Sequence, residues 1–394
     1  MTSPPSPIRA DITALRPSGI GRISALGNGR AGLIALWYGE SDLVTPDFVR
    51  DAAKQALDDG HTFYSSSRGL PRLREGIAHW MQRFVDVQVD VERITVPGSA
   101  MLSVVLALQC LVREGDEVIV ISPMWPNIFQ AVQVVGGVPR FVRLRRDAGG
   151  PWRLDMDELA AAITPRTKAV FLASPSNPTG WIMPAEQQAA LLALCRARGI
   201  GIVADEVYGP IVFDGRHAPS FASIARDDDA LFIVNSFSKA WAMTGWRIGW
   251  LIHPPRLAEA IGTMAVAANT GASSFVQVAA IAAIEQGDEF LATMRARVRR
   301  NRDQLGAFIA AQARLDWAEP PGGFYGYVAI DGVQDSMAFA TALLEQAGVG
   351  VAPGMAFGPE DDRDNDRHVR ICLAIDPQRF ATALERMGRV IGQL

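Results

Sequence analysis

The sequence contains very little lysine. Of its 38 basic residues only Lys54, Lys168 and Lys239 are lysines, and the other 35 are arginines. Lys54 lies in an amphipathic stretch, residues 48–57, that predicts a helix with a solvated face, and Lys168 lies in a polar turn before a predicted strand. Chemistry that requires a buried primary amine would therefore depend on Lys239.

Cysteine and histidine are also scarce. The three cysteines are far apart, odd in number and never spaced as C-x-x-C, so neither a disulfide framework nor a zinc ribbon is expected and a reducing compartment fits. The five histidines show no ligand spacing. We therefore expect no metal site.

Long apolar runs and an excess of positive charge are missing as well. The longest apolar run, residues 101–112, is too short to cross a bilayer. The first residues lack the basic region and apolar run of a signal peptide. A net charge of −4 gives no support for a nucleic-acid or anionic-membrane partner. These features predict a cytoplasmic protein.

The length of 394 residues makes two domains the default expectation. We predict a large domain over residues 45–285 and a small C-terminal domain over residues 286–394. Residues 1–44 are expected to be an arm that contributes to the small domain, and its first 30 residues, rich in Pro, Ser and Gly, are expected to be extended.

From residue 94 onward, short apolar strands alternate with helix-like segments. The predicted strands are 94–96, 117–121, 138–144, 169–173, 200–204, 231–234 and 248–252. This pattern predicts an α/β fold with a mostly parallel central sheet covered by helices on both faces. Beyond residue 252 the pattern fades, and an Arg-rich amphipathic helix from about residue 285 leads to a smaller α+β domain with a late strand at 368–373.

Lys239 follows the apolar strand 231–234 directly. A lysine at this position is costly to bury in its charged form, so it either reaches water or works as a neutral amine, which is the nucleophile of Schiff-base chemistry. Two hydroxyls, Ser236 and Ser238, and the guanidinium of Arg247 are close by in the sequence and suit a phosphate. Together these groups fit an aldehyde cofactor that carries a phosphate, which is pyridoxal phosphate.

Other strand ends also carry polar or aromatic groups. Trp125 follows the strand at 117–121, Asn177 follows the one at 169–173, and Asp205 and Tyr208 follow the one at 200–204. Ligands bind at this edge of parallel sheets, so we expect these side chains to meet Lys239. The turn at residues 98–100 feeds a helix N-terminus, which is a weak signal for phosphate.

Three further segments favour a structural interpretation. Residues 27–32 match a dinucleotide-binding fingerprint, but no strand precedes them and 33–38 looks like a strand, so we predict a turn. The acidic run 361–366 lacks the glycine and terminal glutamate of a calcium loop and is expected to be a solvated loop. From spacing alone, Tyr64 is a packed aromatic.

Taken in order, these segments resemble the class I/II aminotransferases, which are fold-type I pyridoxal-phosphate enzymes, over about residues 39–370. The segments that match are Gly39-Glu40, Tyr64 with Gly69-Leu70-Pro71, Gly98-Ser99-Ala100, Asn177-Pro178-Thr179-Gly180, Asp205-Glu206-Val207-Tyr208, Ser236 to Lys239 with Arg247, Pro353-Gly354 with Phe357-Gly358, and Arg370. The resemblance implies transfer of an amino group between an L-amino acid and a 2-oxo acid.

The resemblance also implies roles for the catalytic residues. Lys239 would form a Schiff base with the cofactor and, as a free amine, move the proton of the substrate. Asp205 would pair with the pyridine nitrogen, and Tyr208 and Asn177 would hydrogen-bond the 3-oxygen of the ring.

The remaining implied roles concern binding. Trp125 and Val207 would pack against the two ring faces. The phosphate would be held by Ser99, Ala100, Ser236, Ser238 and Arg247. Arg370 would clamp the α-carboxylate of the substrate, with Gly39 and Asn177 also contacting the substrate. Tyr64 would reach the phosphate of a neighbouring subunit, which implies a homodimer with shared active sites and replaces the packing interpretation of Tyr64.

Alternatives remain at this point. Lyases, decarboxylases and cyclising enzymes use the same scaffold and differ in which substrate bond is broken. A non-catalytic cofactor-binding regulator would need a DNA-binding module, for which there is no spare length and no basic helix-turn-helix segment.

Ser41 stands where the family usually has proline, and no residue is identified that must bind a second carboxylate. The donor is therefore aspartate or glutamate, or an aromatic or other apolar amino acid.

Overall fold

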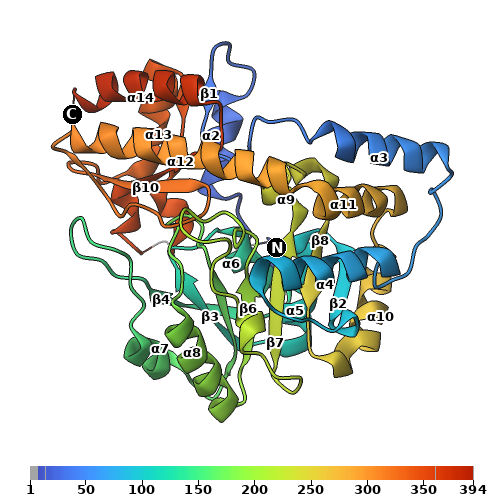
Figure 1. Ribbon diagram of the computed structural model, residues 1–394. Helices are drawn as coiled ribbons and strands as arrows, with labels where there is room; N and C mark the ends of the chain where they lie inside the picture. Colours follow the sequence, from blue (N-terminus) through green and yellow to red (C-terminus); the bar gives the residue numbers. More distant parts are fainter. Residues whose placement is uncertain (1–7, 14, 360, 394) are drawn as a thin grey trace, which may run out of the picture.

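The computed structural model describes residues 8–13, 15–359 and 361–393, and its centre is a seven-stranded sheet (Figure 1). The strands, in sheet order, are β2 (Ile94–Gly98), β8 (Gly249–Ile252), β7 (Leu231–Ser236), β6 (Gly201–Asp205), β5 (Thr167–Ala173), β3 (Glu117–Ser122) and β4 (Val138–Arg143). β8 runs antiparallel to both of its neighbours, and the other pairs are parallel. The predicted mostly parallel α/β sheet is confirmed.

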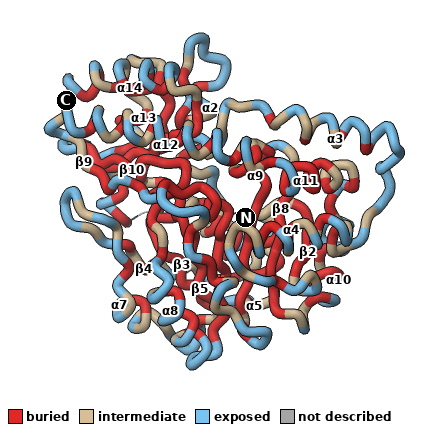
Figure 2. The backbone as a smooth tube through the Cα atoms, viewed as in Figure 1, coloured by how far each residue is buried: buried red, intermediate tan, exposed pale blue. Residues whose placement is uncertain are grey.

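The strands of this sheet are buried because helices cover it. Six of the strands are buried along almost their whole length, as expected for apolar strands covered on both faces (Figure 2). The long helices of this part are α3 (Asp47–Asp58), α4 (Pro71–Val85), α5 (Ala100–Leu111), α6 (Asn127–Val134), α7 (Met156–Ala162), α8 (Ala185–Arg198), α10 (Ala258–Asn269) and α11 (Ser274–Gln286). The four-residue helix α9 (Phe237–Ala240) follows β7 directly and carries Lys239.

A second, antiparallel sheet lies beside the central one. Its strands, in sheet order, are β12 (Ala352–Pro353), β13 (His368–Cys372), β10 (Tyr325–Ile330) and β9 (Leu315–Trp317). The helices around it are α12 (Asp288–Ala310), α13 (Ser336–Ala342) and α14 (Pro377–Ile391), which Figure 1 shows together on one side of the molecule. The apolar face of the Arg-rich α12 packs against β9, β10 and α14.

The N-terminal segment packs against this second sheet. Strand β1 (Ile34–Ala35) pairs in parallel with β11 (Val349–Gly350), and α2 (Gly19–Gly27) contacts β12 and α13. The short helix α1 (Ala10–Thr13) precedes them. The remaining one-turn elements are η1 (Val91–Arg93), η2 (Phe221–Ser223), η3 (Thr244–Trp246), η4 (Pro255–Leu257), η5 (Leu343–Ala347), η6 (Gly354–Phe357) and η7 (Asn365–Arg367).

The structure corrects four local predictions. The arm over residues 1–30 is not extended throughout, because residues 19–27 form α2; residues 1–7 and 14 lie outside the described part. The strand predicted at 33–38 is only two residues long. Lys168 lies inside β5 rather than in the turn before it. The acidic run 361–366 is not simply solvated, because Asp362 is buried and ion-pairs with Arg143.

Three global features bear on function. Among the residues described, no helix combines the length and apolar character needed to cross a bilayer. The described part of the chain contains no group of three or more His, Cys, Asp or Glu residues placed to hold a metal ion. The three cysteines are unpaired.

Candidate active site

A cavity of about 480 Å³ lies where the carboxyl ends of the parallel strands face the second sheet. Ala173, Asp205 and Ser236 end β5, β6 and β7 at this cavity, and Tyr325 and Arg370 reach it from β10 and β13. Segments far apart in the sequence therefore meet at the edge where parallel sheets usually bind ligands.

Most of the residues predicted from the sequence line this cavity. They are Gly39, Ala100, Trp125, Asn177, Asp205, Val207, Tyr208, Ser236, Ser238, Lys239, Arg247 and Arg370. Two predicted residues do not line it. Ser99 lies one position away and caps α5, and Tyr64 lies at the surface of the chain with 89% of its area exposed.

Lys239 lies at the cavity wall, partly buried, with its amine donating a hydrogen bond to the Gly39 carbonyl at 2.6 Å. The loss of surrounding water lowers the pKa of this amine to about 8, and the nearby guanidinium of Arg370 also lowers it. A lysine with this pKa is about one-tenth neutral at pH 7, far more than at its ordinary pKa, and nucleophilic attack on a carbonyl requires the neutral amine.

Asp205 is buried at the end of β6. One of its carboxylate oxygens accepts a hydrogen bond from the Val207 backbone N–H at 3.1 Å. Burial raises the pKa of Asp205 to about 6, opposed by that hydrogen bond and by the positive charge of Lys239. A positively charged partner in the cavity would stabilise the ionised form of this carboxylate.

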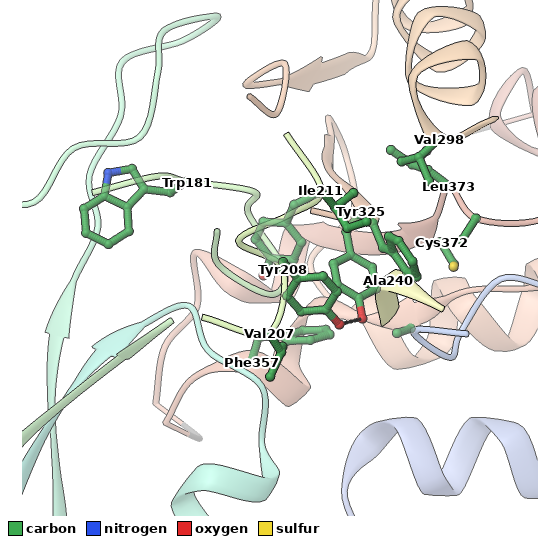
Figure 3. Packing of buried hydrophobic residues seen from close by; sticks show 14 of the residues in the cluster. Trp181, Val207, Tyr208, Ile211, Ala240, Val298, Tyr325, Phe357, Cys372 and Leu373 are labelled. Atoms are coloured by element: carbon green, nitrogen blue, oxygen red, sulfur yellow. Dashed lines mark hydrogen bonds between the residues drawn. The ribbon is translucent and has the colours of Figure 1, made fainter. Parts of the chain in front are cut away.

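Tyr208 and Tyr325 form a buried pair in the cavity wall. Their hydroxyl oxygens lie 2.5 Å apart, and their rings meet edge to face with centroids 5.6 Å apart (Figure 3). Asn177 donates a hydrogen bond from its side-chain nitrogen to the Tyr325 hydroxyl at 3.3 Å. Burial and the neighbouring Tyr325 hydroxyl raise the pKa of Tyr208 well above its ordinary value. Tyr208 is therefore held as a neutral phenol.

Arg370 is almost fully buried and is fixed from several sides. It donates a hydrogen bond to the Asn177 side-chain oxygen at 2.8 Å and another to the Trp37 carbonyl. Its guanidinium carbon lies 4.4 Å from the centre of the Tyr325 ring and 4.9 Å from that of Phe357. Its Nε atom is buried without a partner among the described residues. An oriented guanidinium that lines a cavity is suited to bind a carboxylate in a forked geometry.

Hydroxyl, guanidinium and backbone N–H groups gather at the Ser236 side of the cavity. Ser236 donates to the Ser238 hydroxyl at 2.9 Å, and Arg247 donates to the Thr244 carbonyl at 2.7 Å. The first turn of α5 also lines the cavity, with N–H groups, including that of Ala100, that the helix itself cannot pair. Gly249 allows this approach, because an added Cβ would lie 3.0 Å from the Ala100 nitrogen. This arrangement suits an anion.

The sequence did not single out several residues that line the cavity. Tyr325 is the main one, and Tyr38 and Thr244 are others. Glu40 accepts a hydrogen bond from Thr244, and Tyr38 donates one to Ser24 at 2.8 Å. The available signal for Tyr325 was the Pro320-Pro321-Gly322-Gly323 segment before it, which is typical of a close backbone approach.

Comparison with known proteins identifies the family. The model of the aminotransferase class I and II family matches residues 32–387. The chain is 34% identical to aspartate aminotransferase of Geobacillus stearothermophilus over 364 residues, covering 91% of each chain. It is 35% identical to arginine–pyruvate transaminase of Pseudomonas aeruginosa over 363 residues, covering 92% of this chain and 91% of that one.

A solved structure agrees with this result. A single mutant of Thermus thermophilus aspartate aminotransferase superposes with a TM-score of 0.89 at 33% identity, over 98% of this chain and all of that one. The chain belongs to the class I and II aminotransferase family, and the predicted fold-type I architecture is confirmed. The predicted type of reaction, transfer of an amino group between an amino acid and a 2-oxo acid, is confirmed.

Class I/II aminotransferases depend on pyridoxal phosphate, and the residues present fit that group. An amine of lowered pKa, a buried carboxylate and a group of hydroxyls, a guanidinium and backbone N–H groups suited to a phosphate share one cavity. Gly39 keeps part of this space open, since an added Cβ there would lie 1.7 Å from the Tyr325 hydroxyl.

Proposed function

We propose that this aminotransferase uses pyridoxal phosphate held through Lys239. The observation that carries the proposal is the Lys239 amine, whose pKa is lowered to about 8 within one cavity that also contains Asp205 and Arg370. Groups with strongly shifted pKa values cluster at functional sites. This lysine also shares its cavity with a carboxylate and a fixed guanidinium.

The cavity supports a specific task for each of its polar groups. Asp205 would accept a hydrogen bond from the protonated ring nitrogen, and Tyr208 and Asn177 would bind the 3-oxygen. Trp125 and Val207 would contact the ring faces. The phosphate would be bound by Ser236, Ser238, Arg247 and the first backbone N–H groups of α5, where Ser99 and Ala100 lie.

The chemistry divides between the cofactor and the chain. Bound in this cavity, pyridoxal phosphate would supply a ring that withdraws electrons from the substrate Cα. Arg370 would bind the α-carboxylate of the substrate, with Gly39 and Asn177 beside it. The free Lys239 Nζ, with a pKa near 8, would take up the proton released from Cα.

We further propose that the amino donor has an uncharged, largely apolar side chain. The cations of the cavity are Lys239, Arg247 and Arg370, and each has a task in the transfer itself. Ile20 and Ile128 also line the cavity and offer apolar surface. A donor with a second carboxylate would therefore lack a dedicated partner from this chain.

Each protomer would have two domains, a large one over residues 45–285 and a small one over residues 286–394 that includes the N-terminal arm, residues 1–44. Two protomers would form a homodimer. Phe63 and Tyr64 support an interface, because 83% and 89% of their areas are exposed side by side. In such a dimer Tyr64 would reach the phosphate of the other subunit. Unpaired cysteines agree with a reducing, cytoplasmic compartment.

The test is the absorbance spectrum of the purified protein with pyridoxal phosphate, recorded as single amino acids are added. Conversion of the bound cofactor to its amine form, reversed by a 2-oxo acid, is the expected result. Leucine and phenylalanine should convert it at lower concentrations than aspartate. Cofactor absorbance that never changes with any amino acid would refute transamination at this site, and absence of cofactor binding would refute the assignment of Lys239.

A further inference from the structure

A second cavity, of about 340 Å³, lies outside the candidate active site and shares no lining residue with it. Two segments form most of its wall: residues 143–153, which follow β4, and residues 364–368, which lead into β13. The first segment reaches toward the second sheet (Figure 1), where Arg146 forms an ion pair with Asp316 of β9 at 2.8 Å. The cavity therefore lies between the central sheet and the second sheet.

The wall of this cavity is rich in arginine, although the whole protein carries a net charge of −4. Its charged residues are Arg143, Arg145, Arg146, Arg153 and Arg367, with Asp147 and Asp364. Three of these arginines pair with acids outside the lining, Arg143 with Asp362, Arg145 with Glu158 and Arg146 with Asp316. A concave surface of this size, lined by exposed guanidinium groups, can bind small anions.

Several of these guanidinium groups are available to a ligand. The exposed Arg367 side chain has no ion pair among the described residues. Arg145 pairs with Glu158 at 2.9 Å and Arg153 with Asp147 at 3.7 Å, but both arginine side chains are about two-thirds exposed, at 67% and 66%. Exposed pairs of this kind are weak, so both arginines can turn to another anion.

The inner part of the wall is incompletely hydrogen-bonded. Arg146 Nη1, Trp152 Nε1 and His368 Nε2 are buried nitrogens without a partner in the described part of the chain. The His368 Nδ1 atom donates to the Asp364 carbonyl at 2.7 Å, which leaves Nε2 of the neutral ring as an acceptor. Three unpaired groups within one wall are unusual, because buried polar groups are normally paired. These atoms expose almost no surface to the cavity, so the exposed arginines, and not these nitrogens, are the groups that a ligand would contact.

We propose that this cavity binds a small anion with at least two negative charges, carried by phosphate or by several carboxylates. Guanidinium groups bind both chemistries in a forked geometry. Arg145 and Arg153 would contact the anion from one segment and Arg367 from the other. The bound anion would thus join residues 143–153 to residues 364–368, and no part of the amino-transfer proposal requires it.

The experiment is calorimetric titration of the cofactor-saturated protein with inorganic pyrophosphate and, separately, with citrate, at low ionic strength. We expect saturable binding of at least one probe, and the stronger one identifies the phosphate or the carboxylate class. Arg153→Ala and Arg367→Ala should each weaken binding by about threefold or more, and the double variant by about tenfold or more. Each substituted side chain is exposed, so the fold should persist, and the melting temperature checks this.

Arg300→Ala is the matched control. Arg300 is exposed on α12, has no ion pair among the described residues and lies outside the cavity lining, so its substitution should leave the affinity unchanged. Absence of binding by both probes would overturn the proposal. Equal binding by the double variant and the unchanged protein would do so as well. A loss of cofactor absorbance during the titration would place the anion at the cofactor phosphate site instead and would also overturn it.

Discussion

Removal of the Tyr325 hydroxyl tests the buried pair that it forms with Tyr208. In Tyr325→Phe, the Tyr208 hydroxyl loses a hydrogen bond of 2.5 Å and the Asn177 side-chain nitrogen loses a longer one of 3.3 Å. A buried polar group left without a partner costs about 1–3 kcal/mol. Because the contact to Asn177 is long, we assign most of the loss to Tyr208 and expect the cofactor-free protein to lose about 1–3 kcal/mol of unfolding free energy.

The same substitution should change the chemistry of Tyr208. Burial and the Tyr325 hydroxyl together raise the pKa of Tyr208, so removing that hydroxyl should lower the pKa toward its ordinary value. If Tyr208 binds the 3-oxygen of the cofactor, the pH dependence of the cofactor absorbance should shift. Loss of one hydrogen bond of about 0.5–1.5 kcal/mol should lower kcat/KM by about 2–10-fold.

Tyr327→Phe provides a matched control on the same strand. Tyr327 is equally buried, and its hydroxyl donates to the Asn365 side-chain oxygen at 3.0 Å, but it does not line the active-site cavity. We expect a similar loss of stability, measured by urea unfolding, with no change in the cofactor spectrum or in kcat/KM. The reasoning is refuted if the two variants alter the spectrum equally, or if Tyr325→Phe alters neither stability nor spectrum.

Three further predictions follow from the cavity. Lys239→Ala should abolish the protein-linked cofactor absorbance, while Lys168→Ala, which removes an exposed amine at the start of β5 that donates to the Pro165 carbonyl, should retain it. The Lys239 pKa is lowered from 10.5 to about 8, so the neutral amine becomes scarcer below that pH. The rate at which the cofactor-free protein captures pyridoxal phosphate should fall about tenfold per pH unit below about 8 and level off above it, measured by stopped-flow absorbance. Gly39→Ala should lower cofactor or substrate affinity at least tenfold, because the added Cβ would lie 1.7 Å from the Tyr325 hydroxyl. An unchanged KM together with an unchanged cofactor affinity would contradict this prediction.

The part of the cavity built by the central sheet was predictable from the sequence. Asn177, Asp205 and Lys239 each follow an apolar strand closely, and the carboxyl ends of parallel strands lie at one edge of a sheet. Their convergence therefore required only the α/β pattern and the positions of the residues after each strand. The position of each residue just after a predicted strand is a local feature of the sequence, and it was enough to predict this part of the cavity.

The part built by the second sheet was not predictable in the same way. Tyr325 lies on the antiparallel strand β10, and its place beside Tyr208 depends on how the two sheets pack. The helix α2 was missed because its glycines and nearby prolines disfavour helices, whereas Ser18 caps it and Ile20 and Ile23 are buried. Contacts between segments far apart in the sequence determine both the place of Tyr325 and the formation of α2. Local sequence patterns do not reveal such contacts.

Two adjacent carboxylates show most clearly what the sequence could not decide. Asp205 and Glu206 follow each other, and burial raises the pKa of both, to about 6 and about 7. Glu206 is occupied within the chain, because it accepts hydrogen bonds from the Ser220 hydroxyl at 2.7 Å and the Phe221 N–H at 2.9 Å. Asp205 accepts one such bond, from Val207, and lines the cavity. Of the two, Asp205 keeps free acceptor capacity at the cavity, so under the proposed function it is the carboxylate that would face the ring nitrogen, while Glu206 anchors the chain at Ser220.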